Sequence, residues 1–358
     1  MNLKIDRDRS YGIALEGGGA KGAYQIGVWK ALKEIGIRYH MISGTSVGAL
    51  NGSLMTMGDF DLALSVWQNI HISQVINLGG LDEESMLRIC TLQLNYSDMR
   101  KMAPQMLSIL HNRGLDVQPL REWVHQIVDT KLIRSSDIEL FACTYSISER
   151  KGKEIRINDL PENEICDMLL ASAYFPAFRL EKLSGKYYAD GWFHESLPLS
   201  VLFEHNCRDI IAVALPTLNI QKQAPVPDNV SLTTIRPIAN LGGILEFDAE
   251  RAKTNIDIGY YDAMRVFYGL YGNGYYIDRT MTEKDAFQWL TSRYLSRHPK
   301  ATLREVCETV LPQKAHKLGV RDGDYYDLFV AVLERLAENH SIEKLAIRTD
   351  EQLLSELF

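Results

Sequence analysis

The chain is expected to be an α/β protein with a mostly parallel central sheet wrapped by helices on both faces. Short apolar runs of strand length alternate with longer segments in which apolar residues recur at helical spacing. The run at residues 210–215 is almost continuously apolar, which is typical of a strand covered on both faces. From about residue 280 only helical stripes remain, so a C-terminal helical segment is expected to follow the sheet.

The first expected strand, residues 11–15, leads through Glu16 into a glycine-rich loop. The loop reads Gly17-Gly18-Gly19-Ala20-Lys21-Gly22. A helix is expected next, up to Gly36, because apolar residues fall on one face at Tyr24, Val28, Ala31, Leu32 and Ile35. Unencumbered backbone N–H groups at a helix N-terminus, with a lysine beside them, favour the binding of negative charge.

One interpretation of this loop is a dinucleotide site, because Gly17, Gly19 and Gly22 have the Gly-x-Gly-x-x-Gly spacing. Such a site would make the chain a nucleotide-binding oxidoreductase. It requires an acidic residue at the end of the second strand to bind the ribose, and here that strand ends in Ile42-Ser43-Gly44. A phosphate-binding P-loop is also disfavoured, because Lys21 precedes the last glycine.

A Gly-x-Ser-x-Gly motif, Gly44-Thr45-Ser46-Val47-Gly48, follows the second expected strand at residues 37–42. Small residues at 49–53 can open a closely packed helix, so the motif has the strand–turn–helix context of a nucleophile elbow. Such a turn strains the serine backbone and leaves no room for side chains at the flanking positions, which Gly44 and Gly48 satisfy. Ser46 is therefore the candidate nucleophile, and the loop at 17–22 can supply an oxyanion hole.

These two glycine motifs, in this order, resemble those of the patatin-like phospholipase family. The similarity extends to Ala171-Ser172-Ala173-Tyr174-Phe175-Pro176, to Asp190-Gly191 and to Pro198, and it covers about residues 8–270. Two positions depart from the family pattern. Trp192 replaces a small residue after Asp190-Gly191, and Ser196 stands where asparagine is more usual.

The resemblance implies a three-layer α/β/α sandwich and a serine acyl hydrolase that acts on phospholipids or related acyl lipids. It implies that Ser46 attacks the ester carbonyl and that Asp190, followed by Gly191, completes a Ser–Asp dyad without histidine. The family's oxyanion hole maps onto Gly17, Gly18, Gly19, Ala20, Lys21 and Gly22, and we expect Val47 to add a donor. Neither a metal nor an organic cofactor is required by this chemistry.

The sequence around Asp190 predicts a hairpin. Phe178 and Leu180 alternate with charged residues, Ser184-Gly185 is a turn signal, and residues 186–189 can return as the partner strand. Asp190 would then lie at a strand end, where a partly desolvated carboxylate with a raised pKa can act as a general base. The alternative is that Asp190 only caps the turn that it forms with Gly191.

A Ser–Asp–His triad is the other arrangement of catalytic groups, because two histidines follow Asp190 in the chain order of α/β-hydrolases. His194 is expected at the rim of a cleft, and His205 on a helix over residues 199–205. Neither histidine has the flanking signature of a general base, so the dyad is the preferred interpretation.

The composition argues against nucleic-acid binding and structural metals. The 358 residues are 46% hydrophobic, which allows a large core, and the net charge of −7 comes without a basic stripe. The cysteines share no short spacing, so they indicate reduced thiols in a cytoplasmic protein: Cys90, Cys143, Cys166, Cys207 and Cys307. We expect no signal peptide or membrane span, so a lipid substrate implies transient peripheral contact with a membrane, at its inner face.

The expected organisation is a catalytic α/β domain at residues 8–275 and a C-terminal helical region at 280–358. Residues 71–130 read as mainly helical and can cover the site, hinged at Gly79-Gly80. The C-terminal apolar stripes are more typical of a core than of a membrane anchor. A further alternative is a partner-switched, lipid-binding effector with little basal activity, in which residues 280–358 respond to the partner.

Overall fold

The computed structural model describes residues 1–77, 114–216, 225–320 and 324–358. The chain divides into two compact units: residues 6–263 form one, and residues 1–5 together with 264–358 form the other. The division falls inside the helix α10 (Ala249–Tyr268). The expected boundary between residues 275 and 280 stays a prediction.

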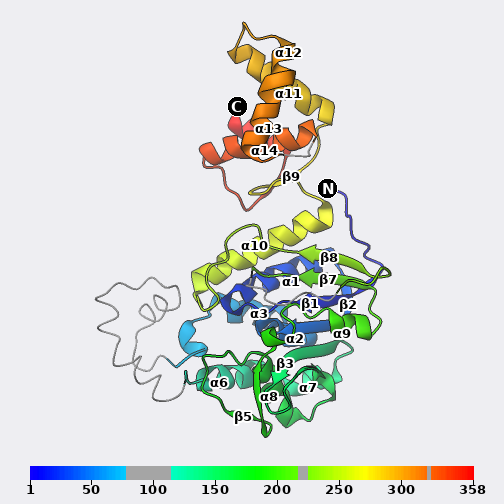
Figure 1. The fold of residues 1–358 in the computed structure, drawn as a ribbon, viewed down its shortest axis with the longest axis vertical. Helices are drawn as coiled ribbons and strands as arrows, with labels where there is room; N and C mark the ends of the chain where they lie inside the picture. The colour runs from blue at the N-terminus through cyan, green and yellow to red at the C-terminus, as the bar shows by residue number, and fades with distance from the viewer. Residues whose placement is uncertain (78–113, 217–224, 321–323) are drawn as a thin grey trace, which may run out of the picture. The chain divides into compact units, whose positions relative to one another are not determined.

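The larger unit is built on a mixed sheet in the order β5-β6-β3-β2-β1-β7-β8, with β4 paired to β3 (Figure 1). The strands are β1 (Ser10–Leu15), β2 (Arg38–Thr45), β3 (Glu139–Ser146), β4 (Lys151–Arg156), β5 (Lys182–Leu183), β6 (Lys186–Asp190), β7 (Asp209–Val213) and β8 (Ser231–Ile235). The pairs joining β3, β2, β1, β7 and β8 are parallel, whereas β4, β5 and β6 are antiparallel to their neighbours. This confirms the predicted mostly parallel α/β sheet.

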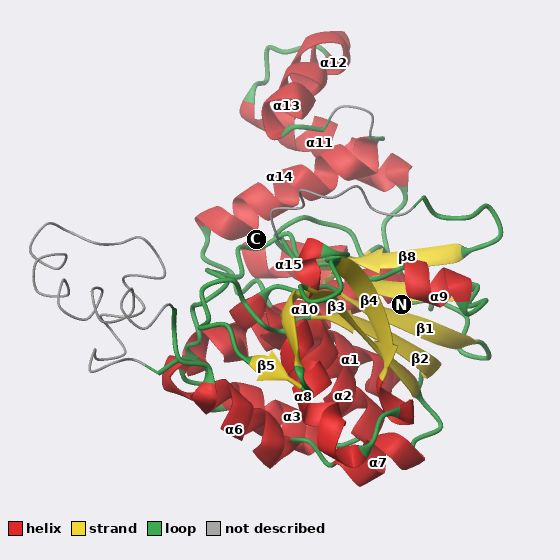
Figure 2. Ribbon diagram, turned by 60° about the horizontal axis from the view of Figure 1, so that its bottom comes forward, coloured by secondary structure: helices red, strands yellow, loops and turns green. Residues whose placement is uncertain are grey.

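Helices cover both faces of this sheet, and each strand alternates its side chains between them. On one face, Gly52 of α2 packs on Leu15, Ile42 and Leu140. On the other face, Gly12 of β1 packs on Leu202 of α9. The helices of this unit are α1 (Ala23–Ile35), α2 (Val47–Met57), α3 (Phe60–Gln68), α6 (Gln118–Ile127), α7 (Thr130–Ser135), α8 (Glu162–Ser172) and α9 (Ser200–Glu204). Figure 2 shows α2 and α8 side by side on one side of the strands.

The helix α1, which follows the glycine-rich loop, packs backbone to backbone against α10. A Cβ atom on Gly27 would lie 1.8 Å from the carbonyl oxygen of Ile256, and one on Gly259 would lie 2.0 Å from that of Tyr24. The Tyr24 hydroxyl also donates to Asp262 at 3.2 Å. These close contacts fix the helix that carries the loop.

The predicted hairpin before Asp190 is present, but its first strand is β5 (Lys182–Leu183), which lies closer to the turn than the alternation at residues 178–181 indicated. The turn is present, with Ser184 and Gly185 at positive φ. Residues 178–181 lie outside this hairpin, and Phe178 forms an isolated parallel bridge with Leu115 instead, through hydrogen bonds at residues 177 and 179. Arg179 and Glu181, the charged residues of that alternation, form an ion pair at 2.7 Å.

Several elements were not expected from the sequence, among them β4, β8 and α10. The expected cover at residues 71–130 falls largely outside the described residues, as does its hinge at Gly79-Gly80. The described ends of that stretch contain the short turn η2 (Ile72–Gln74) and the helix α6.

The smaller unit is mainly helical, as the apolar stripes predicted. Its elements are α11 (Glu283–Arg297), α12 (Leu303–Glu305), a π-helical turn η5 (Val306–Val310), α13 (Leu311–Leu318), α14 (Tyr325–Asn339), α15 (Asp350–Leu357) and a parallel pair of β9 (Tyr276–Asp278) with β10 (Ile347–Thr349). Leu290, Phe329, Leu333 and Leu353 belong to its buried core. The strand pair was not predicted. Throughout the described part of the chain, every helix is too short or too polar to cross a membrane.

Candidate active site

Ser46 lies in the turn between β2 and α2, with a backbone φ of 55° and ψ of −125°. A residue other than glycine in this region is strained and needs support from its surroundings. The neighbouring glycines leave the required room. A Cβ atom on Gly48 would lie 2.2 Å from the carbonyl oxygen of Leu15, and one on Gly44 would lie 2.4 Å from that of Gly48. Thr45 fixes the start of the turn by donating its hydroxyl to the carbonyl of Glu195 at 2.6 Å.

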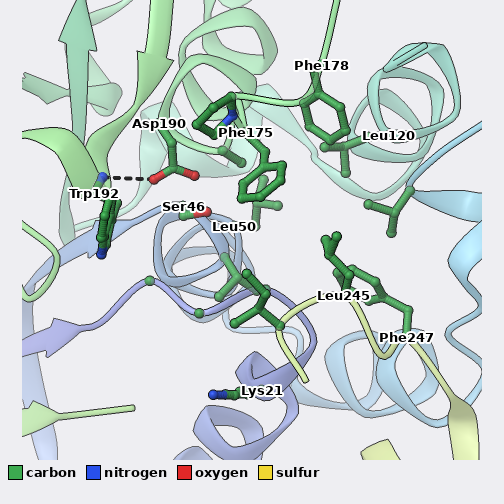
Figure 3. A pocket seen from close by; sticks show the side chains of 18 of the residues that line it. Lys21, Ser46, Leu50, Leu120, Phe175, Phe178, Asp190, Trp192, Leu245 and Phe247 are labelled. Atoms are coloured by element: carbon green, nitrogen blue, oxygen red, sulfur yellow. Dashed lines mark hydrogen bonds between the residues drawn. The ribbon is translucent and has the colours of Figure 1, made fainter. Parts of the chain in front are cut away.

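Asp190 ends β6, and its carboxylate points toward Ser46 (Figure 3). The side chain is buried, and Oδ1 accepts the N–H of Trp192 at 2.8 Å. Burial raises the pKa of Asp190 from 3.8 to about 6, although hydrogen bonds from the Ser46 hydroxyl and the Trp192 N–H favour the charged form. The carboxylate is therefore ionised at neutral pH, yet more basic than an exposed aspartate. That combination suits a group that accepts a proton from a hydroxyl.

The glycine loop lies beside Ser46, and its N–H groups divide into two sets. The N–H of Gly17 donates to the carbonyl of Ser196, and that of Ala20 donates to the carbonyl of Ile244. The N–H of Lys21 donates weakly, at 3.3 Å, within the loop. Among the described residues, the N–H groups of Gly18, Gly19 and Val47 have no protein acceptor. These three remain available to an anion in the pocket.

Lys21 and Glu16 hold the loop to the end of β7. The Nζ atom of Lys21 donates to the carbonyl of Pro216 at 2.6 Å, and burial lowers the pKa of this amine against the opposing effect of Glu16. The Glu16 carboxylate accepts the N–H of Leu215 at 2.7 Å and the hydroxyl of Ser196 at 3.0 Å. Ser196, which departs from the family pattern, thus has Glu16 as its hydrogen-bond partner, next to the glycine loop.

A buried chain of polar side chains supports the same loop from α1, α2 and α3. Trp67 donates to Asn51 at 2.9 Å, Asn51 donates to Gln25 at 2.8 Å and to the carbonyl of Gly22 at 3.0 Å, and Gln25 donates to the carbonyl of Glu16 at 2.7 Å. Buried polar groups that are fully hydrogen-bonded make a site rigid. Sequence reasoning missed this chain, and the signal for it was the presence of Gln25 and Asn51 among apolar and small residues.

A pocket of about 500 Å³ opens onto Ser46 and Asp190. Apart from Lys21 and those two residues, its lining is largely apolar, and it includes Leu50, Leu120, Phe175, Phe178, Leu245 and Phe247 (Figure 3). Gly17, Gly18, Gly19 and Val47 also line it, whereas Ala20, Gly22, Gly44, Thr45, Gly48 and Gly191 do not. The wall at residues 244–247 lies between β8 and α10 and carries no motif, so sequence reasoning missed it.

The two candidate histidines lie outside this pocket. His194 is paired with Glu154, 3.3 Å from Nε2 to Oε1, and the ring of His205 packs on Phe141 with centroids 4.5 Å apart. Within the described ranges, the lining of the pocket contains no histidine. The same part of the chain contains no cluster of three or more histidine, cysteine, aspartate or glutamate side chains that could bind a metal ion.

The sequence pattern of the patatin-like phospholipase family matches residues 13–203, which is more than half of the chain. The chain belongs to the patatin-like phospholipase family. Both Ser46 and Asp190 lie within the matched region.

Among curated proteins, the chain is similar to lysophospholipase nte1 of Aspergillus terreus, with 59% identity over 46 residues, and to neuropathy target esterase sws of Drosophila melanogaster, with 53% identity over 45 residues. Each match covers 13% of this chain and 3% of the relative.

Two solved structures align at low identity. VipD from Legionella pneumophila has 14% identity and a TM-score of 0.44, covering 97% of this chain and 86% of that one. ExoU from Pseudomonas aeruginosa, in complex with SpcU, has 12% identity and a TM-score of 0.36, covering 92% and 68%.

Proposed function

We propose that the chain is a serine acyl hydrolase that cleaves ester bonds of phospholipids or related acyl lipids. The observation that carries the proposal is the buried Asp190 carboxylate, with its pKa near 6, pointing at the strained Ser46 in an apolar pocket. The lysophospholipase and esterase names of the relatives agree with an ester of a lipid as substrate.

In the first step, the oxygen of Ser46 forms a bond to the ester carbonyl carbon while its proton passes to Asp190. The carbonyl oxygen becomes an anion, and the open N–H groups of Gly18, Gly19 and Val47 are the donors that stabilise it. The anion then collapses, the bond to the leaving alcohol breaks, and Asp190 returns the proton to that alcohol. Water hydrolyses the acyl–Ser46 ester by the same proton route, which restores the free enzyme.

The largely apolar pocket suits an acyl chain better than a sugar, a nucleotide or a peptide. Burying methylene groups against aromatic and aliphatic side chains is favourable by about 0.8 kcal/mol per group. Because the substrate belongs to a membrane or micelle, the enzyme is proposed to meet it by transient contact with the lipid surface.

The decisive experiment is labelling of the full chain with a fluorophosphonate probe, followed by mapping of the modified serine and hydrolysis of a panel of lipids and short esters. We expect Ser46→Ala to remove labelling and hydrolysis together. Ser53→Ala is the matched control, because Ser53 is a buried serine on the following helix, α2, whose hydroxyl donates only to the carbonyl of Leu50. Hydrolysis that persists in Ser46→Ala would refute the mechanism.

Two rival functions predict different results, one in the same assay and one in a thermal-unfolding assay. A partner-switched effector would leave the purified chain inert toward both probe and lipids until a partner is added. A nucleotide-binding oxidoreductase would be stabilised against thermal unfolding by a dinucleotide, which an acyl hydrolase would not be.

A further inference from the structure

The strained backbone conformation of Ser46 needs contacts that hold it in place. Ser46 is the only residue between β2 and α2, and its left-handed φ persists only where the surroundings impose it. A relaxed backbone at this position would turn the hydroxyl away from Asp190. Some contact must therefore fix the peptide unit that precedes the Ser46 side chain.

Ser172, the last residue of α8, makes that contact. Its side chain is fully buried, and Oγ accepts the N–H of Ser46 at 2.9 Å. The same hydroxyl donates to the carbonyl of Cys143 in β3 at 2.6 Å. Because a hydroxyl has one proton, its donation to Cys143 directs an oxygen lone pair at the Ser46 N–H.

The end of α8 also holds the other candidate catalytic residue. The N–H of Asp190 donates to the carbonyl of Tyr174 at 2.9 Å, two residues beyond Ser172. One short segment thus contacts the backbone of both Ser46 and Asp190. Ser172 itself does not line the pocket, so it touches no substrate.

We propose that Ser172 is a positioning residue, which holds Ser46 in its strained conformation and so aims the nucleophilic hydroxyl at Asp190. The contact also takes the N–H of Ser46 out of the set of oxyanion donors, which leaves that task to other N–H groups of the pocket. The catalytic part of this inference rests on the proposed function.

The test compares Ser172→Ala with Ser53→Ala, since both variants remove the hydroxyl of a fully buried serine. We expect Ser172→Ala to lower kcat by roughly 10- to 100-fold, because a small misplacement of a reacting group has effects of that size. KM should stay within about twofold, because Ser172 touches no substrate, and Ser53→Ala should leave both constants within about twofold. A folded Ser172→Ala with parental kcat, or an equal loss in Ser53→Ala, would overturn the proposal.

Hydrogen exchange of the Ser46 amide is a second measurement, and it does not require the protein to be catalytically active. We expect this amide to exchange at least about tenfold faster in Ser172→Ala than in Ser53→Ala, because only the former loses its acceptor. Unchanged exchange would overturn the proposal. If the parent chain is inert toward probe and lipids, the proposed function fails while the exchange result still decides the role of Ser172. Should Ser172→Ala not fold, Ser172→Cys, with its weakly accepting sulfur, is expected to show the same two changes.

Discussion

A methyl group on Gly19 would lie 2.0 Å from the carbonyl oxygen of Ile244. The same carbonyl accepts the N–H of Ala20 at 2.8 Å, and Gly19 has a positive φ of 57°. The backbone of the glycine loop therefore contacts the backbone of the pocket wall at 244–247. This contact sets the direction of the Gly19 N–H.

Gly19→Ala is expected to displace the loop and to misdirect the N–H groups that are proposed to stabilise the oxyanion. The expected loss in kcat is about 100- to 1,000-fold, which corresponds to about 2.7–4 kcal/mol. Steady-state kinetics on a lipid ester would measure it. Gly58→Ala is the matched control, because Gly58 also has a positive φ, of 76°, but has open space where the methyl group would lie. The proposed role of the loop is wrong if Gly19→Ala raises only KM, or if the control loses as much activity.

The pKa of Asp190 predicts how activity depends on pH. In the proposed dyad the carboxylate must be ionised to accept the Ser46 proton, so kcat/KM should rise as the pH increases through about 6 and then level off. A series of assays from pH 4.5 to 8 with an uncharged ester would measure this rise. A flat profile between pH 5 and 7 would show that a different group sets the rate.

The same carboxylate is expected to lower the stability of the protein at neutral pH. A pKa raised above the value of 3.8 means that the folded state binds the proton more tightly, so stability is lost as the pH rises through about 6. Asp190→Asn should therefore increase the free energy of unfolding at pH 8 by up to about 3 kcal/mol and lose this advantage near pH 4. Urea denaturation at both pH values measures the difference, and turnover should fall to the level of Ser46→Ala.

Asp59→Asn is a suitable control for that comparison, because Asp59 is an exposed helix cap and asparagine caps equally well. Its stability should follow that of the parent at both pH values. An Asp190→Asn variant that is less stable than the parent at pH 8 would contradict the expectation.

His194→Ala and His205→Ala test the triad alternative. Each variant should keep activity within about tenfold of the parent, which is 1.36 kcal/mol of barrier. The hydrogen bond to Glu154 raises the pKa of His194, so its contribution to stability is present at pH 6 and is lost at higher pH. A folded histidine variant as inactive as Ser46→Ala would make that histidine the base and give Asp190 an orienting role.

The helical unit at the C-terminus is expected to contribute stability rather than catalytic groups. Phe329 is fully buried in its core, so Phe329→Ala should destabilise this unit by about 3–5 kcal/mol. Labelling of Ser46 by a fluorophosphonate should stay within about twofold of the parent. Leu303→Ala, at an exposed position, is the control for both measurements. Loss of labelling in a folded Phe329→Ala would show that this unit shapes the site.

Local chemistry explains which features the sequence could predict. The turn at Ser46 and the loop at 17–22 need glycine at fixed positions, so a short stretch of sequence indicates each of them. The first strand of the hairpin was expected too early, at 178–181, because the alternation of side chains there does not show that Phe178 pairs with Leu115 rather than with the hairpin. The sequence indicated Ser172 only as part of the motif at residues 171–176. Its role could not be predicted, because that role depends on a hydrogen bond between residues 126 positions apart in the chain.

The pocket wall at 244–247 lies beyond residue 203, where the family match ends, whereas Ser46 and Asp190 lie within it. The glycine loop contacts this wall through the backbone carbonyl of Ile244, which most substitutions at 244 would retain. Evolution can therefore change the side chains at 244, 245 and 247 without altering the atoms on which the loop rests. Under the proposed function, a library confined to these three codons would change the preference for acyl chains while it leaves the proposed Ser46–Asp190 dyad and the glycine loop intact.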